Sequence, residues 1–432
     1  MDTAITTLHA RQILDSRGRP TVEVDAWLAC GSCGRASVPS GASTGAAEAH
    51  ELRDGDASQY AGLGVLKAVA NVNGEIAAAL RGADALAQQR IDERLAALDG
   101  TPQLARLGAN AVLAVSLAVC RAAAAASGQQ LYEHMAQLSG TAPLLPLPMT
   151  NILSGGLHAG RGMDVQDFLA VPLRAATFTE ALHLLSRVRN AASHVAQQRG
   201  LPTLLADEGG LSPGLETGAA ALAMMVEAIE RAGLRPGVDM AIAIDVAAST
   251  LCDKADGYRF TREGVHRSSD EVIGMLASWV RDFPVVSIED GLDEEDWSGW
   301  STLTQALGDK VQLVGDDLFA TNPQRLARGI GAGGANGVLV KANQNGTVSG
   351  TLQVIAQARA AGYAAIVSAR SGETEDAFMS DLAVGSAAGQ IKIGSLRTSS
   401  TVAKYNQLLR IEEHSGAAYA GTAPLRGWRG HA

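Results

Sequence analysis

The chain has 432 residues, a length that indicates more than one compact domain, and its 47% hydrophobic and 19% charged residues are an ordinary globular composition. Asp and Glu outnumber Lys and Arg by 45 to 35, and the resulting net charge of -10 argues against general affinity for nucleic acid. An anionic ligand would therefore need local positive charge from Lys, Arg or a metal ion.

The first part of the chain predicts a small α+β domain. Residues 21–28 alternate apolar and polar side chains, and a glycine-containing turn and a second extended stretch follow, which is typical of a β-hairpin. From residue 64 to about 138 the apolar residues recur with a helical period. Three prolines then mark a boundary, so we expect an N-terminal domain at 1–140 and a second domain at 141–432.

The most apolar stretch, residues 109–126, predicts a buried helix. Arg121 interrupts it, and we expect the part on either side to be too short to cross a bilayer. The N-terminus lacks the basic and apolar runs of a secretory signal, and four cysteines are too few for a disulfide scaffold. We therefore expect a cytoplasmic protein with no membrane partner.

Beyond residue 141 one unit recurs, in which a short apolar run ends in a polar residue and is followed by a loop and a helical stretch. The runs lie at 240–245, 284–289, 311–316, 337–341, 364–368 and 390–392. Such alternation indicates a parallel sheet, either doubly wound or closed into a barrel. Because every run carries its polar group near its C-terminal end, where the active sites of barrels lie, a (β/α)8 barrel is favoured.

Acidic residues end three of these runs in succession. In a barrel, Asp245, Glu289 and Asp316 would face one another across the mouth. Carboxylates packed together have raised pKa values unless a cation neutralises them, and oxygen ligands suit Mg²⁺. Any one of these residues could instead cap the helix that follows it, but three together favour a metal site.

Basic residues end the runs that come next. Lys341 and Lys392 each end a run, and Arg370 and Ser371 follow the run between them. A lysine that faces another lysine and a metal site has its ammonium form disfavoured, so it can act as a base, and Arg370 suits a phosphate. Glu208, in a glycine-rich segment, could place a carboxylic acid over the same mouth. These groups suit removal of a proton next to a carboxylate, followed by loss of a hydroxyl group.

Longer segments carry a resemblance to a known family. They lie at residues 13–18, 39–44, 52–56, 207–210, 245–249, 287–291, 315–319, 370–376 and 403–413. In this order they resemble enolase, the phosphopyruvate hydratase family, from end to end.

The resemblance implies a barrel of ββαα(βα)6 order, a homodimer or ring of dimers, a small phosphorylated carboxylic acid as substrate, and two Mg²⁺ ions per active site. Surface display, which enolases can show without a signal peptide, leaves no mark in the sequence. The resemblance implies that the first magnesium is bound by Asp245, Glu289 and Asp316 and the second by Ser43. It implies that Lys341 is the base and Glu208 the acid. The phosphate would be bound by Arg370 and Ser371, and the rest of the substrate would contact Gln166, Lys392, His158 and Asp167.

Three positions depart from the family pattern. Enolases carry Glu where this chain has Asp167, Glu where it has Leu157, and His where it has Ala369. Each change shortens or removes a polar group around the end of the site where the hydroxyl leaves. Retracting a carboxylate by about one bond length can cost on the order of a hundredfold in rate.

Three functions are compatible with this sequence. The first is the reversible dehydration of 2-phospho-D-glycerate to phosphoenolpyruvate. The second is a reaction of phosphonate metabolism, in an enzyme that resembles carboxyphosphonoenolpyruvate synthase and uses the room at Ala369 for a different phosphorus group. The third is a non-catalytic enolase homologue that acts as a binding protein, against which the intact metal and lysine positions argue. The sequence favours the first.

Overall fold

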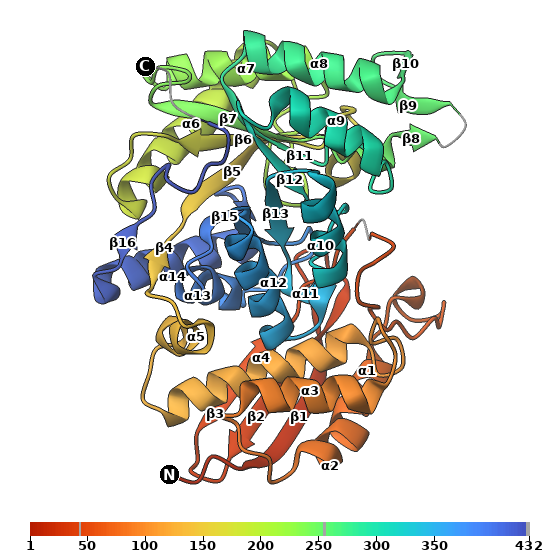
Figure 1. The fold of residues 1–432 in the computed structure, drawn as a ribbon, viewed down its shortest axis with the longest axis vertical. Helices are drawn as coiled ribbons and strands as arrows, with labels where there is room; N and C mark the ends of the chain where they lie inside the picture. The colour runs from red at the N-terminus through yellow and green to blue at the C-terminus, as the bar shows by residue number, and fades with distance from the viewer. Residues whose placement is uncertain (43–44, 254–255, 429–432) are drawn as a thin grey trace.

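The computed structural model describes residues 1–42, 45–253 and 256–428. Its N-terminal part, red to orange in Figure 1, is an antiparallel sheet covered by helices. The strands β1 (Ile5–Leu14), β2 (Pro20–Leu28) and β3 (Cys33–Ser37) pair in that order, and β2 with β3 forms the predicted hairpin. The α-helices are α1 (Leu66–Asn71), α2 (Ala77–Leu80), α3 (Gln88–Asp99), α4 (Ala109–Ala126) and α5 (Leu131–Ser139).

Helix α4 packs across β2 and β3 and forms the centre of this N-terminal part. By length and composition alone its 18 residues could cross a membrane, but 83% of it is buried inside the protein. The prediction of a buried helix is therefore confirmed. Arg121, the one charged residue of the apolar stretch, lies within the helix, and its guanidinium donates to both carboxylate oxygens of Asp376, at 2.6 and 2.7 Å.

The second part of the chain is a closed barrel whose strands follow the order β11-β12-β13-β14-β15-β5-β6-β7. Strand β6 runs antiparallel to both of its neighbours, and the other neighbouring pairs are parallel. The strands are β5 (Leu147–Ser154), β6 (Asp167–Pro172), β7 (Met240–Asp245), β11 (Val285–Glu289), β12 (Gln312–Gly315), β13 (Gly337–Val340), β14 (Ala364–Ser368) and β15 (Gly389–Gly394). The predicted α/β barrel with a smaller α+β part before it is confirmed.

Helices surround the barrel (Figure 1). Two of them follow the β5-β6 pair and one or two follow each later strand, which is the ββαα(βα)6 order. They are α6 (Phe178–Gln198), α7 (Gly218–Arg231), α8 (Ser269–Asp282), α9 (Trp297–Leu307), α10 (Pro323–Ala332), α11 (Ala342–Asn345), α12 (Val348–Ala360), α13 (Phe378–Gly385) and α14 (Ser399–Ser415). Short strands β4 (Leu144–Leu145) and β16 (Ala418–Tyr419) pair with each other, and β8 (Cys252–Asp253), β9 (Gly257–Phe260) and β10 (Val265–Arg267) form a small sheet.

Apolar side chains fill the barrel at the end where its parallel strands begin. Leu147, Met149, Val286 and Leu339 belong to this inner cluster, and Leu425 from the C-terminal segment packs against them. With this end closed, the polar residues are left at the opposite end, where the parallel strands finish. That end is the mouth of the barrel.

The close approach of β3 to α4 depends on Gly34. A Cβ atom at this position would lie 2.2 Å from the Ala118 carbonyl oxygen and 2.4 Å from the Ala122 nitrogen. We expect Gly34→Ala to push strand and helix apart and to lower the free energy of unfolding by about 1–3 kcal/mol. Gly274 in α8 is a matched control, because a Cβ there would meet nothing within 4 Å. Gly274→Ala should raise the free energy of unfolding by up to about 1 kcal/mol.

Denaturant unfolding of the two glycine variants measures both effects. Equal stability of Gly34→Ala and the unmodified protein would show that the sheet and α4 can separate at no cost.

Candidate active site

The predicted site residues meet at the mouth because of how the strands run. Asp245 and Glu289 are the last residues of β7 and β11, Asp316 and Lys341 directly follow β12 and β13, and Lys392 lies in β15. Arg370 and Ser371 come just after β14. Since β6 is antiparallel, its first residue rather than its last lies at this end, and Asp167 pairs with Asp245 in the sheet.

Two lysines and three carboxylates form the centre of the site. Lys392 Nζ lies 2.8 Å from Asp245 Oδ2 and 2.7 Å from Glu289 Oε2. Lys341 Nζ lies 2.5 Å from Asp316 Oδ2. The three acids are 2–8% exposed, so these charges interact with little screening by water. The predicted convergence of the acids and the lysines is therefore present.

The pKa values of these acids differ because each has different neighbours. Burial, and then the charge of Asp245, raise the pKa of Glu289 well above its ordinary value. Burial also opposes ionisation of Asp245 and Asp316, but Lys392 and Lys341 respectively outweigh it and lower the pKa of each. These directions agree with the prediction that carboxylates packed together have raised pKa values unless a cation neutralises them, because the ammonium groups act as counter-cations to Asp245 and Asp316.

The carboxylates around Lys341 raise its pKa. Burial and the repulsion by Arg370 and Lys392 favour the neutral amine. The negative charges around the lysine, with Asp316 first and Glu289 next, together outweigh these effects. The Lys341 ammonium now neutralises Asp316. For Lys341 to lose its proton readily and act as a base, another cation has to bind Asp316 in its place.

The donor set fits such a cation. Asp245, Glu289 and Asp316 offer only oxygen ligands, which is the preference of Mg²⁺, and the carboxylate oxygens of Asp290, Asp316 and Asp317 also gather within 4.8 Å of one another. Both oxygens of Asp290 accept backbone N–H groups, from Asp316 and Asp317 at 2.9 Å each. Asp290, which sequence reasoning missed, thus orients the loop of Asp316. Ser43, predicted for the second Mg²⁺, lies outside the described residues.

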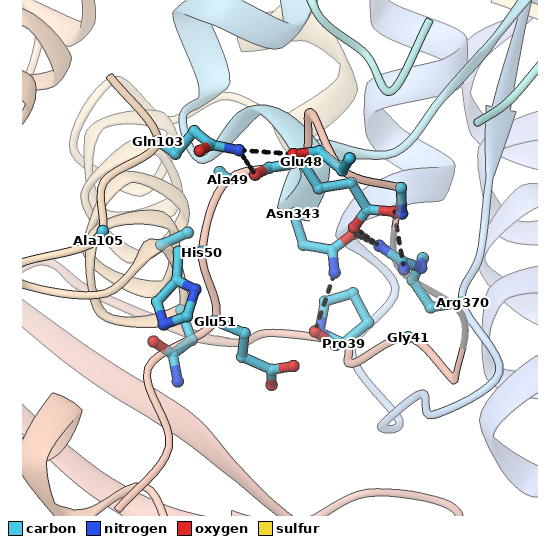
Figure 2. Close-up of a pocket in the computed structure, with 14 residues that line it drawn as sticks. Pro39, Gly41, Glu48, Ala49, His50, Glu51, Gln103, Ala105, Asn343 and Arg370 are labelled. Atoms are coloured by element: carbon cyan, nitrogen blue, oxygen red, sulfur yellow. Dashed lines mark hydrogen bonds and ion pairs between the residues drawn. The ribbon is translucent and has the colours of Figure 1, made fainter. Parts of the chain in front are cut away.

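Arg370 and Ser371 lie against the N-terminal part of the chain. Arg370 Nη1 donates to Glu48 Oε2 and to Asn343 Oδ1, both at 3.0 Å (Figure 2). Arg17 Nη1 donates to Ser371 Oγ at 3.0 Å. Sequence reasoning missed Glu48, Arg17 and Asn343, although Arg17 stands within the enolase-like segment 13–18.

A cavity of about 410 Å³ opens beside Arg370. Its lining comes from both parts of the chain, with Glu48, His50 and Gln103 from the N-terminal part and Asn343 and Arg370 from the barrel (Figure 2). The lysines and the strand-end acids are not in its lining. The cavity therefore borders the predicted phosphate end of the site rather than its centre.

A buried polar chain forms the opposite end of the site. Ser154 Oγ donates to Asp167 Oδ1 at 2.6 Å, and Asp167 Oδ2 accepts from His158 Nδ1 at 3.0 Å. The second ring nitrogen, His158 Nε2, lies 3.9 Å from Glu208 Oε1. Asn151 Nδ2 donates to Glu208 Oε2 at 3.2 Å. The predicted residues Asp167, His158 and Glu208 are thus brought together, and Ser154 and Asn151 were missed.

Glu208 has the properties of an acid catalyst. Burial raises the pKa of its carboxyl, and the positive charge of His158 only partly offsets this. A raised pKa keeps a proton on the carboxyl nearer to neutral pH, which general acid catalysis requires.

Two departures from the family pattern, Asp167 and Leu157, lie at this end, whereas Ala369 directly precedes Arg370. Asp167 is fully buried between Ser154 and His158, Leu157 is half-buried, and Ala369 is 5% exposed. The shorter carboxylate at 167 therefore has two partners of its own. Gln166 lies next to it, and Gln166 Nε2 donates to Asp245 Oδ2 at 3.3 Å.

The His158 pair should make stability depend on pH. Burial opposes the charge of His158, but Glu208 and Asp167 outweigh it and raise its pKa from 6.5 to about 9. A histidine whose pKa is higher in the folded state stabilises the fold fully below about pH 6.5, and this contribution is lost as the pH rises through about 9. We expect the melting temperature to fall between pH 7 and 9, by an amount corresponding to at most on the order of 3 kcal/mol.

Thermal unfolding of the unmodified protein and of Asp167→Asn across this pH range tests the expectation. The melting temperature should fall less steeply with pH in Asp167→Asn than in the unmodified protein. Identical slopes of melting temperature against pH would contradict the assignment to His158 and Asp167.

Fold and site together define a class of protein. It is an α/β-barrel protein with an acidic, lysine-containing site suited to a divalent cation at the mouth. The family model described as "Enolase, N-terminal domain" matches residues 5–135, and the one described as "Enolase, C-terminal TIM barrel domain" matches residues 142–426. The chain therefore belongs to the enolase family, whose members use Mg²⁺, and it is an enolase-type lyase.

Proposed function

We propose that this protein catalyses the Mg²⁺-dependent dehydration of 2-phospho-D-glycerate to phosphoenolpyruvate. The observation that carries the proposal is the placement of a lysine and a carboxylic acid on opposite sides of the mouth. Lys341 follows β13, and Glu208 contacts Asn151 on β5 and lies near Asp167 on β6. In the closed order of eight strands, β13 is three strands from β5 and four strands from β6, and four is the largest separation possible.

This placement suits removal of a proton and of a hydroxyl group from opposite faces of a small substrate. With its phosphate at Arg370 and Ser371, the substrate would lie between the two groups. Lys341 would take the proton from C2, and Glu208 would protonate the hydroxyl at C3, so that it leaves as water. Mg²⁺ held by Asp245, Glu289 and Asp316 would supply the charge that stabilises an enolate.

The assay that tests this proposal follows phosphoenolpyruvate formation from 2-phospho-D-glycerate by ultraviolet absorbance, with and without Mg²⁺. We expect robust activity that requires Mg²⁺ in the unmodified protein. The matched variant restores the family residues through Ala369→His with Asp167→Glu. If the unmodified protein has negligible activity and only this variant is active, the proposal is contradicted. That result would favour a different phosphorus-bearing substrate.

A further inference from the structure

Two amide oxygens at the mouth are buried without a hydrogen-bond donor among the described residues. They are Asn151 Oδ1, on β5, and Gln166 Oε1, just before β6. Asn151 is 0% exposed and Gln166 is 6% exposed. Because a buried acceptor without a donor costs free energy, each oxygen marks a place where a ligand can donate.

The structure fixes which way Asn151 points. Along β5, Leu147 and Met149 belong to the cluster inside the barrel, and Thr150 faces outward, where its hydroxyl lies 2.8 Å from the Tyr405 hydroxyl. By the alternation of a strand, Asn151 continues the inward row. It lies nearer to the mouth than Leu147 and Met149, and its Nδ2 contacts Glu208.

Asn151 therefore presents two different groups at one place. Its NH₂ group holds the carboxyl that acts as the acid, and its oxygen lacks a donor. A hydroxyl oxygen of a ligand can do both, because it can receive a proton from Glu208 and donate its own hydrogen to Asn151.

We propose that Asn151 binds the hydroxyl group that leaves the substrate, an inference that rests on the proposed function. The substrate hydroxyl donates its hydrogen to Asn151 Oδ1, and its oxygen faces Glu208. Lys341 takes the proton from C2, and the electron pair of that C–H bond forms the double bond between C2 and C3. The C3–O bond breaks as Glu208 transfers its proton, and water leaves. The site thus selects phosphorylated acids with a hydroxyl group at C3.

Binding of two ligands that differ only in this hydroxyl tests the inference. 2-Phospho-D-lactate has a hydrogen where 2-phospho-D-glycerate has the C3 hydroxyl. The unmodified protein with Mg²⁺ should bind the glycerate at least about tenfold more tightly, since binding the lactate leaves Asn151 Oδ1 without a donor. In Asn151→Leu, which has a similar volume and no polar group, the two affinities should become equal.

A kinetic measurement separates this role from a general disruption of the site, and the affinity ratio separates it from the positioning of Glu208. Exchange of the C2 hydrogen with deuterated solvent needs Lys341 but no leaving hydroxyl. In Asn151→Leu we expect kcat for dehydration to fall on the order of a hundredfold, while exchange stays within about threefold of the unmodified rate. Thr150→Val is the matched control, because it removes a buried hydroxyl of the same strand on its outer face and should change neither the affinity ratio nor the exchange.

The outcomes are distinct. An unchanged affinity ratio in Asn151→Leu, or equal losses of exchange and dehydration, would overturn the role of Asn151. If Asn151→Leu does not fold, as judged by circular dichroism, Asn151→Ala provides the same comparison. If the unmodified protein does not dehydrate 2-phospho-D-glycerate, the proposed function fails, and the affinity ratio alone then decides whether Asn151 binds a hydroxyl group.

Discussion

Replacing Lys341 with alanine should lower kcat for dehydration by about a thousandfold and abolish exchange of the C2 hydrogen to a similar extent. General base catalysis commonly contributes factors of about 100 to 10,000, and proton removal next to a carboxylate depends strongly on the base. Lys341 is nearly buried, with 13% of its side chain exposed, and water enters such a place less easily than an open cleft as a substitute base. Both reactions should therefore fail together.

Glu208→Gln is the matched variant for this prediction. It removes the proton that leaves with the hydroxyl but keeps the size of the side chain. We expect it to lose dehydration to a similar extent while exchange of the C2 hydrogen continues. Nuclear magnetic resonance of 2-phospho-D-glycerate in deuterated buffer measures exchange and dehydration in one sample. Exchange that survives in Lys341→Ala would show that another residue is the base. The first candidate would then be Lys392, the other lysine of the site.

The strand-end residues could be predicted because parallel strands place their C-terminal ends at one edge. Asp245, Glu289 and Asp316 needed only the position of each apolar run and this geometric rule. Asp167 and Gln166 could not be found in this way, because β6 is antiparallel and brings its first residue to the mouth. Only the resemblance to enolase placed them there.

Contacts between distant segments could not be predicted from local patterns. Glu48 and Arg370 are 322 residues apart, and Arg17 and Ser371 are 354 residues apart. No period or spacing within one element links such residues. The pKa of Lys341 also depends on such a contact, with Asp316, whose length the sequence does not give.

Ser154 shows why a departure from a family pattern has to be interpreted with its neighbours. Considered alone, Asp167 has a carboxylate that lies closer to the backbone than that of the glutamate in the family pattern. In the structure its oxygens are held by Ser154 and His158, so its position is fixed by contacts and not only by its length. Asp167→Glu alone would have to fit one more methylene group into a fully buried place, which commonly costs about 1–3 kcal/mol.

Removing Mg²⁺ with a chelator should lower the rate of dehydration by at least about a thousandfold. The intermediate of the proposed reaction gains negative charge next to a carboxylate, and a metal ion typically supplies several kcal/mol of stabilisation to such charge. In the proposed function the three strand-end acids hold the ion. Glu289→Gln should therefore raise the half-saturating Mg²⁺ concentration by about 10- to 100-fold. Asp317→Asn is the neighbouring control and should raise it less, because burial and the charge of Asp316 raise the pKa of Asp317 to about 7 and leave it partly neutral.

The pH dependence of the magnesium requirement gives a second test of the same site. Burial and the charge of Asp245 raise the pKa of Glu289 well above its ordinary value, so protons compete with Mg²⁺ for this carboxyl at higher pH than for an ordinary glutamate. As the pH falls, the half-saturating Mg²⁺ concentration of the unmodified protein should therefore rise. In Glu289→Gln, which has no such proton to displace, the rise should be smaller. Activity titrations at several pH values measure both proteins, and parallel curves would remove Glu289 from the ligands, because a carboxyl that binds the ion cannot keep its proton at the same time.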